Sequence, residues 1–136
     1  TFFESGRPRD AVKPYRRALD LKPPSDQFKL AYAEAVLSAS PSRPELQSLI
    51  PLLEQANRSR AWPSAWHYLG QVYAGLGQIA VADYFAAEYN AAVGENAVAS
   101  RQLAKALKQP LPANIKLRAE DLKARLAQEN KKNSLF

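Results

Sequence analysis

Apolar residues recur along this chain at the spacing of α-helices. A final helix is predicted by apolar residues at intervals of four, three and four positions, which share one helix face: Ile115, Ala119, Leu122 and Leu126. β-Branched residues are sparse, and no run of alternating apolar and polar positions indicates a strand. The sequence therefore predicts an all-α fold.

Prolines, glycines and capping residues divide the chain into helices of about 14 residues joined by short turns. The first helical run ends at residues 22–24, after which Ser25 or Asp26 can cap a second helix. Further boundaries are predicted at the loop 38–44, before a helix over 45–59, at Pro63, at Gly77 and Gly94, and at 108–114. The pattern thus predicts a series of short antiparallel helices.

Three of these helices have features that orient them. The second helix is predicted to turn an apolar face inward through Phe28, Tyr32 and Ala35. Pro14 and Pro51 fall inside helices, where a proline removes a backbone hydrogen bond and bends the helix. We therefore expect both prolines on the outer sides of their helices.

A pattern of glycine, alanine, a large residue and a second alanine repeats along the chain. It occurs as Gly6, Ala11, Tyr15, Ala18 and as Gly94, Ala99, Leu103, Ala106, with a partial copy at Gly77, Ala82, Ala86, Tyr89 and a glycine-free relative at Leu49, Leu53, Ala56. With a short insertion allowed in the 38–44 loop, these copies approximate a 34-residue period. A period of this length is typical of stacked helix pairs, which bury their apolar faces only against neighbouring pairs.

The segment "WHYLGQVY" (66–73) matches the signature of tetratricopeptide repeats in its residue types and spacing. The fold class predicted is a right-handed superhelix of antiparallel helix pairs, with Gly70 as the point of closest approach between paired helices. The residues assigned to repeat packing are Ala11, Tyr15, Ala18, Trp66, Leu69, Gly70, Tyr73, Ala82, Ala99 and Ala106. In this register the chain begins inside a first-repeat helix, of which residues 1–3 form the last turn.

The other face of the same helices is the candidate binding surface. The inner groove of a helical solenoid is its usual partner surface. We predict that it is lined by Gln27, Leu30, Glu34 and Leu37 from one repeat and by Ser64, His67, Gln71 and Ala74 from the next. Exposure to solvent alone, or coverage by another domain, remains an alternative for these residues.

The order of the repeats resembles a particular family. The segments 5–23 and 65–107, followed by "LRAED" (117–121), are similar to the C-terminal tetratricopeptide region of bacterial periplasmic zinc metalloproteases of the BepA/YfgC type. The resemblance implies an upstream protease domain with an HExxH zinc site, a periplasmic location, and a role in outer-membrane protein assembly and quality control. It also implies two kinds of protein partner, the protease domain itself and outer-membrane assembly or substrate proteins.

The net charge of +6 is unevenly distributed. Residues 1–99 are neutral, with ten basic and ten acidic residues, whereas residues 100–136 hold nine basic and three acidic ones. This basic third, including Lys116, Arg118 and Lys123, is an alternative surface for an anionic partner. It lacks interleaved aromatic residues, which disfavours stacking on single-stranded nucleic acid. Residues 129–136 are predicted to be a flexible tail.

Residues for catalysis are few. The chain has one histidine, His67, no cysteine and no HExxH motif, so we expect no zinc site and no cofactor within it. Glu120 and Asp121 are adjacent and point to different faces of a helix, so they do not form an acid–base pair. No apolar run reaches the ~20 residues that span a bilayer. We therefore expect a non-enzymatic interaction domain, with a free-standing repeat scaffold and a nucleic-acid binder as the alternatives.

Overall fold

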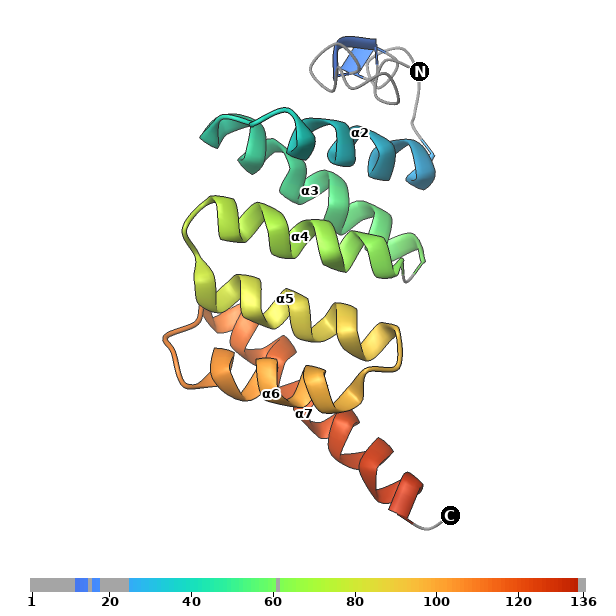
Figure 1. The fold of residues 1–136 in the computed structure, drawn as a ribbon, viewed down its shortest axis with the longest axis vertical. Coiled ribbons are helices and arrows are strands. Elements are labelled where there is room, and N and C mark those ends of the chain that lie inside the picture. Colours follow the sequence, from blue (N-terminus) through green and yellow to red (C-terminus); the bar gives the residue numbers. More distant parts are fainter. Residues whose placement is uncertain (1–11, 15, 18–24, 61, 135–136) are drawn as a thin grey trace.

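The chain is all-helical throughout the part that the computed structural model describes, which comprises residues 12–14, 16–17, 25–60 and 62–134. Its helices are α2 (Asp26–Ser38), α3 (Arg43–Ser59), α4 (Pro63–Gly75), α5 (Ile79–Ala92), α6 (Asn96–Leu107) and α7 (Ala113–Ser134). They follow one another along the long axis of the molecule, and the end of α7 projects beyond the stack (Figure 1). The all-α prediction is confirmed. None of the described helices is both long enough and apolar enough to span a bilayer.

Local side chains explain where α2 and α3 begin. The predicted cap at Ser25 is confirmed, because its hydroxyl accepts a hydrogen bond from the Phe28 N–H at 3.2 Å. Ser42 and Glu45 form a reciprocal capping box, in which each side chain accepts from the other's backbone N–H. This box starts α3 at Arg43, two residues before the predicted start, because Pro44 is tolerated in a first turn.

Glycines end α4 and α5 in the same way. Gly77 and Gly94 have φ angles of +79° and +85°, a left-handed conformation that favours glycine. In both turns the next residue donates back to the helix, from the Gln78 N–H to the Tyr73 carbonyl at 2.9 Å and from the Glu95 N–H to the Asn90 carbonyl at 2.8 Å. The two predicted helix boundaries lie 17 residues apart, and the same turn structure recurs at both.

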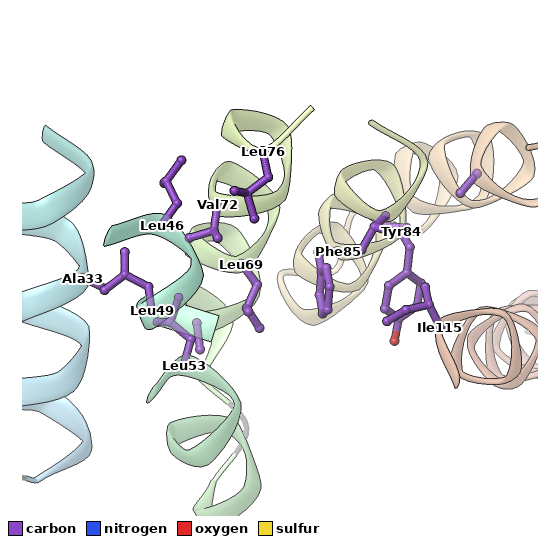
Figure 2. Close-up of a cluster of buried hydrophobic side chains, with 14 of the residues drawn as sticks. Ala33, Leu46, Leu49, Leu53, Leu69, Val72, Leu76, Tyr84, Phe85 and Ile115 are labelled. Atoms are coloured by element: carbon purple, nitrogen blue, oxygen red, sulfur yellow. The ribbon is translucent and has the colours of Figure 1, made fainter. Parts of the chain in front are cut away.

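The described core runs through the helices from α2 to α7. Leucines of α3 and α4, among them Leu49, Leu53 and Leu69, are fully buried, and Tyr84 and Phe85 of α5 lie beyond them (Figure 2). The apolar face predicted for α2 is incomplete: Ala35 is buried, Phe28 and Tyr32 are half-buried, and Leu30, Ala33 and Val36 are buried as well. The reason is that α2 packs against both α3 and α4, so a wider stripe of it is covered.

The helices form two sets of three. Within each set every helix contacts the other two: α2, α3 and α4 form the first set, and α5, α6 and α7 form the second. The α4–α5 interface joins the sets, and among the described helices α4 and α6 make no contact. In a uniform array of helix pairs, every pair stacks on the next in the same way, so the contact of α2 with α4 would be followed by a contact of α4 with α6. Here the corresponding contact joins α5 to α7 instead.

Gly70 lies at the interface that joins the two sets. A Cβ atom placed on it would be 3.6 Å from the Ala82 carbonyl oxygen and 3.7 Å from the Ala86 nitrogen. These are ordinary van der Waals distances, so α4 lies against the α5 backbone at Gly70, and the position accepts a small residue. Of the other packing residues, Leu69, Ala99 and Ala106 are buried, Trp66, Tyr73 and Ala82 are half-buried, and Ala11, Tyr15 and Ala18 lie outside the described residues.

The terminal helix confirms its predicted stripe. Ile115, Ala119, Leu122 and Leu126 are all buried. Residues 129–134, predicted as part of a flexible tail, lie in the last turns of α7, and the side chains of 129–133 are exposed. Pro14 and Pro51 are exposed, as expected for prolines on the outer sides of helices.

Candidate functional site

The predicted groove residues are distributed between solvent and the core. Gln27, Glu34, His67, Gln71 and Ala74 are exposed, and Leu37 and Ser64 are half-buried. The prediction for Leu30 is wrong: its side chain is only 8% exposed and belongs to the core. Leu30 lies one turn before Ala33 on the face of α2 that packs inward, which removes it from any binding surface.

Three exposed members of this set belong to a small polar and aromatic cluster on α2, α4 and α5, which we call the α4 face: Glu34, His67, Tyr68, Gln71 and Tyr89. The Gln71 and His67 side chains are hydrogen-bonded, with 3.1 Å between Nε2 atoms. The His67 ring lies 5.1 Å from the ring of Tyr89 and 5.8 Å from that of Tyr68, centroid to centroid. The imidazole is therefore placed between two phenol rings while its outer side stays exposed.

Tyr68 joins the two repeats across this face. Burial raises the pKa of the Tyr68 phenol, and the nearby Glu34 carboxylate raises it further. The Tyr68–Glu34 contact connects α4 to α2, so the face is continuous over two neighbouring helices. Such a surface offers carboxylate and amide hydrogen-bonding groups beside aromatic rings.

Sequence reasoning missed both tyrosines of the α4 face. A signal was available for Tyr89, because it occupies the position at which the repeat pattern otherwise has a small residue. Its large ring reaches the neighbouring helix and contacts His67. Tyr68 carried no comparable signal, since a tyrosine beside His67 could equally have pointed into the core.

A second cluster, centred on Arg118 of α7, was also missed. The guanidinium donates to the Glu54 carboxylate of α3 at 3.2 Å. It also lies 5.3 to 5.7 Å from the ring centroids of Trp66, Tyr84 and Phe85. Arg118 is therefore a half-buried contact between α7 and three other helices, and the sequence-based grouping of it with an exposed basic surface is wrong.

The aromatic residues beneath Arg118 are stacked on one another. Phe85 stacks with Trp66 at 5.9 Å and with Tyr73 at 5.3 Å between ring centroids. Burial raises the pKa of Tyr73, the nearby Glu54 raises it further, and Arg118 opposes both. The two aromatic residues of the repeat signature thus fix α4 against α5.

Within the described residues, Glu88 is a charged residue whose side chain is buried in the core. Its carboxylate accepts hydrogen bonds from the Tyr84 hydroxyl and, at 3.3 Å, from Arg125 of α7. Burial raises the pKa of Tyr84, and the Glu88 charge raises it further, so the phenol stays protonated and donates. Because the carboxylate is enclosed by these partners, its role is to attach α7 to α5.

Acidic residues of earlier helices neutralise part of the basic third. Arg118 pairs with Glu54, Arg125 pairs with Glu88, and Lys105 lies 3.9 Å from Asp83. The positive potential of α6 and α7 is therefore smaller than the residue count of 100–136 suggests. In the described part of the chain, no three histidine or acidic side chains are grouped as a metal site would require.

No known protein family, characterised protein or solved structure matches this chain significantly.

Proposed function

We propose that this chain is a non-catalytic interaction domain of the tetratricopeptide type, in which the helix pairs form a right-handed superhelix. We further propose that it binds a protein segment on its α4 face. The observation that carries the proposal is the exposed cluster of Glu34, His67 and Gln71. A hydrogen bond joins His67 to Gln71, and the His67 ring contacts that of Tyr89. Glu34 lies near Tyr68, and all three side chains of the cluster are exposed. Two further observations support the repeat type: the close approach at Gly70, and the pair of glycine-ended helices 17 residues apart.

The groups on this face define the partner segment by its chemistry. On the α4 face, Glu34 carries a negative charge, while Gln71 offers an amide group and His67 an imidazole. A partner segment that fits would present hydrogen-bond donors, including a lysine or arginine beside Glu34. The rings of Tyr68 and Tyr89 provide apolar contact area next to these polar groups.

We further propose that the domain belongs to a periplasmic zinc metalloprotease of the BepA/YfgC type. Its partners would then be the protease domain in the same protein and an outer-membrane assembly or substrate protein. The support for this step is the resemblance of segments 5–23 and 65–107 and of "LRAED" (117–121) to that family. Zinc would be held by the protease domain and by no residue of this chain.

The sequence of the gene upstream of Thr1 tests this family assignment. We expect an HExxH motif in the same reading frame. A gene that encodes no such motif contradicts the protease assignment and favours a free-standing repeat scaffold, while leaving the α4 face to be tested by itself.

Nucleic acid is a weaker candidate partner. Several cations of residues 100–136 are paired with carboxylates of α3 and α5, which reduces the charge left for phosphates. Binding to a DNA duplex that falls steeply with added salt, and that is lost when Lys116 and Lys123 are replaced by glutamine, would reverse this order of preference.

A further inference from the structure

A groove of about 440 Å³ lies between α6 and α7, away from the α4 face. Leu103 and Leu126 form its buried base, and the exposed residues Ala104 and Ala127 form part of its walls. Because these wall residues are small, an apolar depression remains above the two leucines. The helices α6 and α7 that form it lie at the C-terminal end of the stack (Figure 1).

Two other pairs of contacting helices in this molecule are covered by a third helix. In the first set of helices, α4 packs against both α2 and α3, and in the second set α7 packs against both α5 and α6. The groove also lies between two contacting helices, α6 and α7, and a further helix is an element that such a surface can hold.

The charged residues of the groove are two lysines. Lys108 of the α6 C-terminus and Lys123 of α7 line it, and no acidic residue does. Within the described residues neither ammonium group forms an ion pair, in contrast to Lys105, Arg118 and Arg125. An apolar base with unpaired cations beside it is complementary to an amphipathic helix that carries carboxylates next to its apolar stripe.

We propose that the α6–α7 groove binds an acidic amphipathic helix of a partner protein. Leucine-type side chains of that helix fill the depression above Leu103 and Leu126, and its carboxylates pair with Lys108 and Lys123. The lining segments, 100–108 and 123–130, each extend over roughly 12 Å of helix, so a helix of two to three turns covers the groove. This surface is separate from the α4 face and does not depend on the family assignment.

The test uses the whole chain and a synthetic helical peptide of 14 residues. The peptide has leucines at helical spacing on one face and glutamates on both sides of that face, and a matched peptide has glutamines in place of the glutamates. Calorimetric titration should show the glutamate peptide binding about tenfold more tightly than the glutamine peptide at low salt, with the difference shrinking as salt is added.

Matched variants of α7 localise the binding. Ala127→Tyr fills the groove, and Ala124→Tyr places the same side chain on an exposed position outside it. We expect Ala127→Tyr to weaken peptide binding at least tenfold and Ala124→Tyr to leave it unchanged, with both variants retaining the wild-type helical circular dichroism. Lys123→Gln together with Lys108→Gln should remove the preference for the glutamate peptide, whereas Lys116→Gln should keep it.

Three results would overturn the proposal. The first is equal binding of the two peptides. The second is peptide binding that Ala127→Tyr does not weaken. The third is saturable binding of dodecanoate that Ala127→Tyr abolishes while neither peptide binds, because the groove would then be a site for a small amphipathic anion.

Discussion

At the scale of single residues, Gly70 lies where α4 contacts the backbone of α5. A Cβ there meets the Ala82 oxygen, the Ala86 nitrogen and the Phe85 Cβ at 3.6 to 3.8 Å, which is ordinary van der Waals contact. Alanine therefore fits, and its higher helix propensity should keep stability equal or raise it by up to ~1 kcal/mol. The further carbons of leucine would overlap the α5 backbone and should cost about 1–3 kcal/mol.

Urea denaturation of Gly70→Ala and Gly70→Leu measures both effects. A leucine variant as stable as the wild type would show that α4 and α5 do not approach closely at this position. The alanine variant is the control, because it separates the change in helix propensity from the change in size.

The residue scale also shows what a single sequence can reveal. The packing roles of Leu69 and Gly70 followed from a spacing that recurs in stacked helices, and burial and contact distances agree with them. The prediction that Leu30 lines the groove was wrong, because a helix that packs on two neighbours buries a wider stripe of side chains than a helix that packs on one. The contacts of Arg118 could not be predicted, since its partner Glu54 is 64 residues away in the chain and repeats carry no signal for such a pair.

At the scale of helices, Asp26 connects the start of α2 to the end of α3. Its carboxylate accepts hydrogen bonds from the Ser59 hydroxyl and, at 3.4 Å, from the Trp62 indole N–H. The Ser59 hydrogen bond is the main cause that lowers the pKa of Asp26 below its ordinary value of 3.8, with smaller contributions from Trp62 and Lys29 that together outweigh the effect of desolvation.

A lowered pKa gives the stabilisation a definite pH dependence. The contribution of Asp26 is fully present above its ordinary pKa of 3.8 and is lost as the pH falls through the lower pKa of the folded state. We expect wild type to have a higher urea midpoint than Asp26→Asn at pH 7, and the difference to shrink below pH 4. A difference that is constant from pH 7 to pH 2.5 would show that the ionised carboxylate is not what connects the helices.

The contact between α3 and α7 depends on Arg118 and Glu54. Removing the guanidinium leaves a half-buried carboxylate and three rings without their cation, so Arg118→Ala should lower the free energy of unfolding by about 1–3 kcal/mol. Lys116→Ala is the control, because Lys116 lies two residues before Arg118 and is exposed, and it should change the free energy of unfolding by no more than ~0.5 kcal/mol.

A double-mutant cycle with Glu54→Gln measures the pair itself. We expect a coupling free energy of at least ~0.5 kcal/mol. Strict additivity of the two single changes would mean that Arg118 stabilises α7 through the aromatic rings alone.

At the scale of the whole molecule, the two sets of three helices distinguish this chain from a uniform repeat array. The helix count and order could be predicted, because prolines, glycines and caps mark each boundary in the sequence. How the second set packs could not be predicted, since spacing fixes which face of a helix is apolar and leaves open which of several neighbours covers it. The absence of contact between α4 and α6, and the contact of α5 with α7, are properties of that packing.

The same organisation separates the two proposed surfaces. The α4 face lies on the first set and its junction with α5, whereas the α6–α7 groove lies on the second set. A partner held on one surface leaves the other accessible. A domain of this form could therefore hold two proteins at once, which is the property that an interaction module between a protease domain and an assembly partner requires.

The affinity of the α4 face for the protease domain tests the central proposal most directly. The protease domain that we propose to be encoded upstream would be produced separately, and its binding to this chain measured for wild type, for Glu34→Gln combined with Gln71→Ala, and for Lys116→Gln as the control. Loss of partner hydrogen bonds should cost roughly 1–3 kcal/mol of binding free energy in the double variant, with its melting temperature and the binding of the control unchanged. Wild-type affinity in the double variant would contradict the account and assign the interaction to another surface.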